Sequence, residues 1–415
     1  MDLQPSTPSA AYWDAAGLGM DADKLDALVD FLDRKYICTG KLPHMQLIVS
    51  RDEKVVVDVA RGQARADGTP LRGDALFRIA SMTKPVTSVA FLMLVEAGLT
   101  ALDDPVDRVI PEFRGLRVGI GGASAPRRPM TMRDLLRHTS GLTYGLQCRT
   151  PIDAAYRALG LDEFQQERGS DDFIAALAGL PLEFSPGDKW NYSVSTDVLG
   201  VVVERLSGMR LDRYFSERIF EPLGMADSFF VVPAGKAERL TDAWQLRGNG
   251  GLSIADRGRR SRWSRPLRFF SGGGGLVSSA ADYHRFSLML LRDGELGGAR
   301  LLKPETIADM RTNHLPGGRD LTALSTAMFS EAGYAGTGFG LGVAVTMDAA
   351  RACGNVGEYC WGGIFSTYFF IDPIERLIAI FMTQHMPSSV HPVRAELRAM
   401  VRDAVVRRHG PARSA

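Results

Sequence analysis

A serine and a lysine one helical turn apart are the pair in this sequence best suited to covalent chemistry. They are Ser81 and Lys84, within the segment FRIASMTKP at residues 77–85. Apolar residues continue to Val95 and Gly98 provides a stop, so the sequence predicts a helix with Ser81 at its N-terminus. Free backbone N–H groups and the positive end of the helix dipole favour a developing oxyanion at such a position.

The chemistry that this pair would support is nucleophilic attack on an acyl carbon. Lys84 lies on the same helix face as Ser81, within reach of its hydroxyl. A serine nucleophile needs a neighbouring base, and a lysine whose pKa is lowered by partial burial or a nearby cation can be that base. Four-residue S-x-x-K patterns also arise by chance, so this spacing alone favours a plainer interpretation, an N-capping serine beside a solvated lysine.

Two later segments add candidate residues. Tyr192 lies on a loop just before a helix predicted at about 195–206, where the structural alternative is a core or interface aromatic. The segment at 361–364 precedes a strand predicted from Thr367. Its two glycines indicate a backbone that stays open for a ligand, and the structural alternative is a bulge or a tight turn.

In this order, the three segments resemble the motifs of the serine β-lactamase and penicillin-binding-protein superfamily, specifically the class C-like branch that includes the family VIII carboxylesterases. The matching residues are Ser81-Met82-Thr83-Lys84, Tyr192-Ser193-Val194 and Trp361-Gly362-Gly363. The stretches at 135–142, 222–225 and 271–276 also look familial, and the resemblance covers roughly residues 20–405.

The resemblance implies a role for each motif. Ser81 would be the nucleophile, and Lys84 and Tyr192 would act as a coupled base. The main-chain N–H groups of Ser81 and Ile364 would form the oxyanion hole, which typically contributes a few kcal/mol of transition-state stabilisation. Residues 361–363 would contact the substrate. No metal and no organic cofactor is implied.

The sequence departs from the β-lactamases of this class at two positions. Their tyrosine motif continues to an Asn where Val194 stands, and their third motif is Lys-Thr-Gly, whose lysine binds the substrate carboxylate, where Trp361 stands. Both changes remove polar groups that hold a β-lactam, and the tryptophan adds an apolar wall suited to a neutral group. The sequence therefore favours a serine carboxylesterase that acts on short-acyl esters through an acyl-Ser81 intermediate.

Three alternatives stay open. They are an acyltransferase of the same mechanism, a β-lactamase or D-amino-acid peptidase, and a non-catalytic acyl- or peptide-binding protein that retains the fold. The presence of Ser81, Lys84 and Tyr192 together argues against the last. No G-x-S-x-G pentapeptide occurs, which excludes the nucleophile elbow of the α/β-hydrolases.

The elements that must position these residues indicate an α+β fold. Runs at 45–50 and 55–60 predict one hairpin near the N-terminus, and runs at 367–371 and 377–382 predict another near the C-terminus, with a further strand at about 341–346. Amphipathic helices are predicted at about 22–35 and 393–407. The simplest architecture is an antiparallel sheet flanked by helices with a mainly helical insertion, which the resemblance makes β-lactamase/transpeptidase-like.

Two domains are expected, with the site in the cleft between them. A discontinuous α/β sheet domain would comprise residues 1–100 and 276–415 and carry the nucleophile helix and the W-G-G strand. A mainly helical domain at 101–275 would carry the catalytic Tyr192.

Composition narrows the partners. Hydrophobic residues make up 45% and charged residues 23% of the 415 residues, which excludes intrinsic disorder. Forty-nine Lys+Arg against 48 Asp+Glu argue against a nucleic-acid or anionic-membrane partner and leave a small-molecule ester as the expected partner.

Four scattered cysteines without a CxxC pair indicate neither a disulfide framework nor a structural zinc site. No apolar run is long enough to span a bilayer and no secretory signal is visible, so a cytoplasmic location is expected. The oligomeric state is not indicated.

Other conspicuous residues have plainer interpretations. The basic run at 257–268 is predicted to be a solvated loop, with a cleft wall for acidic substrates and a nucleic-acid contact as the alternatives. His138 is predicted to cap or pack its short helix rather than act as a base. Cys353 and Cys360 are predicted to be reduced bystanders at the rim of the site.

Overall fold

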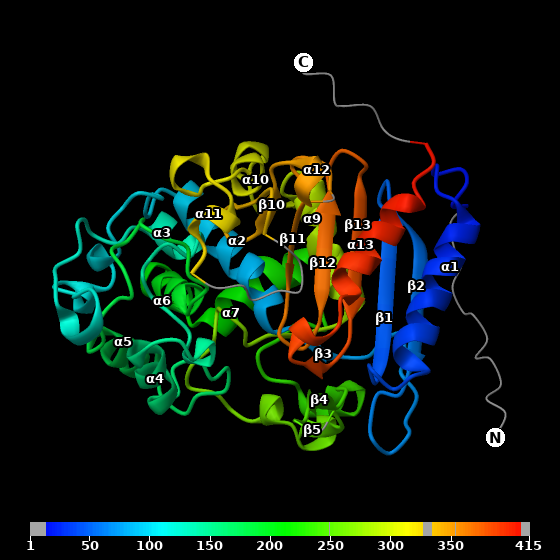
Figure 1. The fold of residues 1–415 in the computed structure, drawn as a ribbon, viewed down its shortest axis with the longest axis horizontal. Coiled ribbons are helices and arrows are strands. Elements are labelled where there is room, and N and C mark those ends of the chain that lie inside the picture. Colours follow the sequence, from blue (N-terminus) through cyan, green and yellow to red (C-terminus); the bar gives the residue numbers. More distant parts are fainter. Residues whose placement is uncertain (1–13, 249, 327–333, 353, 408–415) are drawn as a thin grey trace.

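A seven-stranded sheet is the main sheet of this computed structural model, which describes residues 14–248, 250–326, 334–352 and 354–407 (Figure 1). Its strand order is β2-β1-β13-β12-β11-β10-β9, and neighbouring strands are antiparallel throughout. The strands are β1 (His44–Arg51), β2 (Lys54–Gly62), β9 (Thr337–Phe339), β10 (Ala344–Thr346), β11 (Tyr359–Gly362), β12 (Tyr368–Asp372) and β13 (Leu377–Met382). The prediction of one antiparallel sheet built from both ends of the chain is confirmed.

Helices cover both faces of this sheet. Helices α1 (Ala22–Leu32) and α13 (Val393–Asp403) lie over one face, and α9 (Ala280–Leu291) lies behind the other (Figure 1). The alternation of side chains along β1 follows from this arrangement, because successive residues of a strand point to opposite faces. Leu47 packs with α1 and α13, whereas Ile48 packs into the core that contains α9. The central strands β1, β12 and β13 are therefore buried on both sides.

The predicted terminal elements are correct in kind and differ at their ends. The helix expected at 22–35 is α1 followed by a π-helical turn at Asp33–Ile37, and the helix expected at 393–407 is α13, which ends at Asp403. The strand expected at 341–346 begins only at Ala344. The reason is Gly342, whose φ of 95° bends the chain there.

The region between the two hairpins is dominated by short helices. It contains α2 (Thr83–Glu96), α3 (Met132–Leu136), α4 (Pro151–Ala158), α5 (Ser170–Ala178), α6 (Ser195–Ser207), α7 (Leu211–Phe215), α8 (Glu221–Leu223), α10 (Pro304–Met310), α11 (Leu321–Leu324) and α12 (Ala349–Ala352). A capping box of Thr131 and Asp134 opens α3. Helix α2 packs against α6, which brings the Ser81 segment against the segment that follows Tyr192.

Small sheets were missed by the sequence analysis. Strand β4 (Ala243–Leu246) lies between β14 (His385–Met386) and β5 (Leu252–Asp256) in a three-stranded sheet, and β3 (Phe77–Arg78) pairs with β6 (Val277–Ser278). A further hairpin joins β7 (Glu295–Leu296) and β8 (Ala299–Arg300). Because β4 pairs with β14, a strand near the C-terminus, the mainly helical segment also contributes to a sheet. The division into 1–100 with 276–415 and 101–275 stays a prediction.

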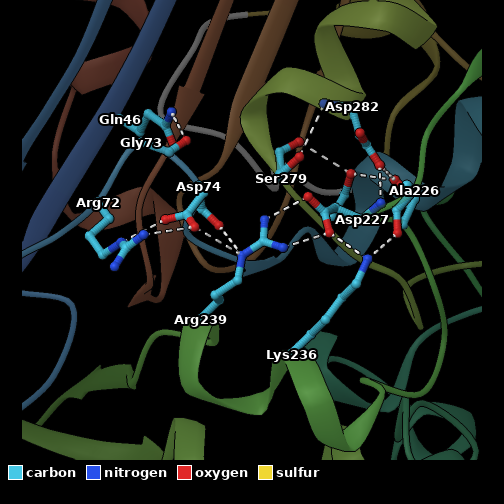
Figure 2. Close-up of polar contacts among 12 residues, drawn as sticks. Gln46, Arg72, Gly73, Asp74, Ala226, Asp227, Lys236, Arg239, Ser279 and Asp282 are labelled. Carbon is cyan, nitrogen blue, oxygen red and sulfur yellow. Dashed lines mark hydrogen bonds and ion pairs between the residues drawn. The ribbon is translucent and has the colours of Figure 1, made fainter. Parts of the chain in front are cut away.

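An ion-pair cluster anchors the approach to β3 (Figure 2). Arg239 donates from Nη1 and Nη2 to the carboxylate of Asp227 at 2.8 and 2.6 Å and from Nε to the Asp74 carbonyl at 2.7 Å. The Asp227 N–H in turn donates to Asp282, near the start of α9, at 2.6 Å. These contacts join three separate segments just before the chain reaches the Ser81 turn.

None of the helices in the described ranges has the length and apolar character that crossing a bilayer requires.

The packing of α1 on the sheet predicts a large cost for truncating Leu28, which is fully buried in the core under that helix. Leu28→Ala should lower the free energy of unfolding by about 2–5 kcal/mol, because it removes apolar contacts and leaves a cavity. Urea unfolding followed by circular dichroism measures this change. The control is Leu99→Ala, whose side chain is 53% exposed and should cost no more than about 0.5 kcal/mol. Equal losses for the two variants would contradict this packing.

Candidate active site

Ser81 lies in a 3₁₀ turn, Ala80–Met82, immediately before α2 rather than within the α-helix. Ala80 has a φ of 44°, in the left-handed region that a side chain disfavours. Strained backbone of this kind persists only where the surrounding structure holds it, and it is frequent at functional sites. The turn places Ser81 on the wall of a cavity of about 610 Å³.

Lys84 is fully buried in the first turn of α2 and is held by three acceptors. Its Nζ donates to Ser81 Oγ at 3.2 Å, to the Tyr144 hydroxyl at 3.1 Å and to the Gly273 carbonyl at 2.6 Å. An ammonium group has three N–H donors, so these contacts satisfy all of them. The plainer interpretation, in which Lys84 is solvated, is therefore wrong. Protein acceptors replace water around its buried amino group.

Tyr192 lines the same cavity as Ser81, and its ring lies next to Lys84. The Lys84 Nζ is 4.6 Å from the centroid of the Tyr192 ring, a distance at which the ring face attracts a cation. The Tyr192 hydroxyl accepts a hydrogen bond from Trp361 Nε1 at 3.4 Å, and the two rings are 5.4 Å apart. The tyrosine and the tryptophan of two distant motifs thus meet beside the serine.

The third motif lies at the end of β11 and continues into Ile364 on the wall of the cavity. A side chain at Gly363 would bring its Cβ to 2.5 Å from the Ile79 carbonyl oxygen and into Thr367 Oγ1. Glycine is therefore required for β11 to lie directly against the turn that carries Ser81. The predicted residues Ser81, Lys84, Tyr192, Trp361, Gly362, Gly363 and Ile364 are all brought to one place. Their chemical roles stay predictions.

Tyr144 was missed by the sequence analysis, although it lies two residues beyond the familial stretch at 135–142. It is buried against Tyr192, with ring centroids 5.2 Å apart, and accepts the hydrogen bond from Lys84. Burial raises its pKa well above 10, and the nearby carboxylate of Asp197 reinforces the shift. Tyr144 is therefore a neutral phenol at physiological pH and a poor candidate for the base.

Arg394 of α13 was also missed. Its Nη2 donates to the Gly363 carbonyl at 2.6 Å and to the Thr367 carbonyl at 3.1 Å, and its guanidinium lies where a Gly362 side chain would be. Gly362 thus leaves room for a cation that braces the W-G-G segment. No local pattern in the sequence marks this contact, because a helix near the C-terminus supplies it.

The other singled-out residues keep plain roles. His138 is fully buried, its ring lies 4.9 Å from that of Tyr192, and burial lowers its pKa well below 6.5, which agrees with packing. Arg262, Arg265 and Arg268 are exposed and line a different hollow, of about 1050 Å³. The basic run is therefore not a wall of the cavity that holds Ser81. Cys360 is unpaired and lines that cavity.

Cys353 lies outside the described residues. Within the described ranges, no group of three or more His, Cys, Asp or Glu side chains is placed to hold a metal ion.

Comparisons with known proteins test the predicted family resemblance. A family model described as Beta-lactamase matches residues 22–402. Protein Rv1367c of Mycobacterium tuberculosis is 39% identical over 332 residues, covering 77% of this chain and 80% of that protein. Esterase EstB of Burkholderia gladioli is 34% identical over 418 residues, covering 96% of this chain and 100% of that protein.

A solved structure shows the same fold. It is EstCE1, described as a hydrolase with promiscuous acyltransferase activity, with a TM-score of 0.77 and 26% identity over 93% of this chain and 99% of that one. The predicted superfamily resemblance and the β-lactamase/transpeptidase-like α+β fold are confirmed.

The close approach at Gly363 predicts that Gly363→Ala slows covalent labelling of Ser81 by a fluorophosphonate about 100-fold, because the added methyl group pushes β11 away from the Ser81 turn. The rate of labelling under pseudo-first-order conditions measures this effect. The matched control is Gly73→Ala, where a side chain would meet open space. Labelling of Gly363→Ala at the rate of the control would contradict the predicted geometry.

Proposed function

The chain belongs to the beta-lactamase family, and we propose that it is a serine carboxylesterase that hydrolyses short-acyl esters through an acyl-Ser81 intermediate. The observation that carries the proposal is the hydrogen bond between Ser81 and the buried Lys84, at 3.2 Å, on the wall of a cavity that Trp361 also lines. A serine that is hydrogen-bonded to a buried amine is poised for acyl transfer.

In the proposed mechanism, the Lys84–Tyr192 pair takes the proton of Ser81 as its Oγ attacks the ester carbonyl carbon. The oxygen of the tetrahedral intermediate accepts hydrogen bonds from the main-chain N–H groups of Ser81 and Ile364. The same proton then passes to the departing alcohol oxygen as the bond between carbon and that oxygen breaks. Water repeats the sequence on the acyl-enzyme, which releases the acid and restores the Ser81 hydroxyl.

The preference for small neutral esters rests on the lining of the cavity. Trp361 stands where β-lactamases have a substrate-binding lysine, and its indole N–H is directed to the Tyr192 hydroxyl. Arg394 of α13, which also lines the cavity, donates to the main-chain carbonyls of Gly363 and Thr367. Esters without a carboxylate near the reacting carbonyl therefore suit this site best.

The cytoplasmic location stays a prediction. The unpaired Cys38, Cys148 and Cys360 fit a reducing compartment, and cell fractionation would test it.

Hydrolysis of p-nitrophenyl acetate, butyrate and decanoate beside nitrocefin tests the proposed function. We expect fast turnover of acetate and butyrate and slow turnover of decanoate and nitrocefin. Ser81→Ala should lower kcat/KM for butyrate by at least about 1000-fold, because the nucleophile is lost. Ser207→Ala is the matched control and should keep full activity, because it removes a hydroxyl at the C-terminal end of α6 that contacts only main-chain groups, the Val203 carbonyl and the Met209 N–H. Absent ester turnover, or turnover that survives Ser81→Ala, would overturn the proposal.

An acyltransferase is the second candidate, since EstCE1 is described as having promiscuous acyltransferase activity. With p-nitrophenyl butyrate and increasing butanol, we expect butanoic acid as the main product, because water in large excess reaches the acyl-enzyme. Gas chromatography of the products measures the partition between acid and butyl ester. Butyl ester as the main product at low butanol concentration would favour the acyltransferase.

A further inference from the structure

A glycine-rich loop at residues 271–275 lies between α2 and α6, and no step of the proposed mechanism uses it. A Cβ at Gly272 would come to 2.8 Å from the Thr196 carbonyl oxygen and 3.1 Å from Thr87 Cγ2, so the loop touches both helices. The Thr87 hydroxyl donates to the Gly272 carbonyl at 2.7 Å. Contacts with both helices therefore fix the loop in place next to Lys84.

Gly273 connects Lys84 with a buried carboxylate. Its carbonyl accepts the 2.6 Å hydrogen bond from Lys84 Nζ, and its N–H donates to Asp197 Oδ1 at 3.1 Å. The same Oδ1 accepts a 2.5 Å hydrogen bond from the Ser271 hydroxyl. A Cβ at Gly273 would collide with the Asp197 carboxylate, so glycine is required for this approach.

Asp197 lies on the first turn of α6 and is 4% exposed. Burial raises its pKa, while the positive charge of Lys84 and the hydrogen bonds from Ser271 and Gly273 oppose that rise. A buried carboxylate with two donors and a cation beside it is a group placed for its charge. In the sequence it follows Ser195 and Thr196 at the polar start of the helix predicted at about 195–206.

The titratable groups around Lys84 come from several elements. Tyr144 lies on the segment after α3, Tyr192 on the loop before α6, and His138 at the end of α3, where Lys84 helps to lower its pKa. Asp162 acts on Tyr144 from the segment after α4. Asp197 combines two properties. The charge of Lys84 acts on its pKa, and its carboxylate accepts the N–H of Gly273, whose carbonyl accepts a hydrogen bond from Lys84.

We infer that Asp197 is a positioning residue of the site: it holds the Gly273 carbonyl against Lys84, and its negative charge sets the pH range in which the Lys84–Tyr192 pair accepts the Ser81 proton. The inference rests on the proposed function and deepens it. A negative charge favours the proton-bearing form of any neighbouring group. Removing it makes the unprotonated base available at lower pH, whichever of Lys84 and Tyr192 takes the proton.

The test is the pH profile of Asp197→Asn, which keeps the shape and the acceptor oxygen and removes the charge. We expect the acid limb of kcat/KM for p-nitrophenyl butyrate to move to lower pH by about one unit. Asp282→Asn is the matched control: Asp282 is also buried, accepts from Asp227 N–H and Ser228 Oγ, and belongs to the cluster in Figure 2. Its acid limb should coincide with that of the wild type.

A profile of Asp197→Asn that falls uniformly, with its acid limb at the wild-type position, would overturn the inference, because a merely structural role lowers activity without moving the limb. Wild-type protein that leaves all esters intact would instead refute the proposed function. In that case, the rate of fluorophosphonate labelling of Ser81 measured against pH gives the position of the acid limb without an ester substrate. If a thermal melt shows that Asp197→Asn does not fold, Ser271→Ala replaces it as the test variant. It removes the 2.5 Å hydrogen bond that stabilises the ionised form of Asp197, so the acid limb should move in the same direction by a smaller amount.

Discussion

Burial of the Lys84 side chain is the constraint on which the rest of the site depends. Taking an ammonium group out of water costs several kcal/mol unless acceptors replace the lost hydration. The three acceptors come from separate parts of the chain: the turn of Ser81, the segment of Tyr144 and the loop of Gly273. Each part must therefore be placed correctly before Lys84 can be covered. The strained φ of Ala80 and the glycine-rich approach to α6 are consequences of that requirement.

The W-G-G segment adds a second layer to this arrangement. The Gly363 carbonyl, which Arg394 holds at 2.6 Å, and the Ile364 N–H belong to one peptide unit. A charged donor on the carbonyl both fixes the plane of that unit and polarises its N–H. Helix α13 thus acts on the cavity through the main chain of β11, while its other face packs with the sheet.

Much of this architecture could be predicted from the sequence, because local patterns encode it. The β-rich runs predicted the two hairpins, the S-x-x-K spacing made Ser81 and Lys84 candidates, and the family resemblance gave roles to them, to Tyr192 and to the segment at 361–364. The contacts of Tyr144 and Asp197 could not be predicted in the same way, because their partners come from distant segments. Ser271, for example, is 74 residues from Asp197 in the chain. Strands β4 and β5 were missed because their residues are mostly half-exposed and lie among Gly and Arg.

The position of β1 between β2 and β13 has a consequence for the order of events during synthesis. Strand β1 acquires its inner neighbour only when a segment more than three hundred residues later has been made, as the contact between Arg51 and Glu375, 324 residues apart, illustrates. Until then the N-terminal hairpin presents an open edge and an apolar face to the ribosome exit and to chaperones. Strand pairs so far apart in the sequence slow folding, because the entropy lost in closing a long loop precedes the stabilising contacts. The helices between the two hairpins can form in the meantime, so the pairing of β1 with β13 completes the seven-stranded sheet only after they have been made.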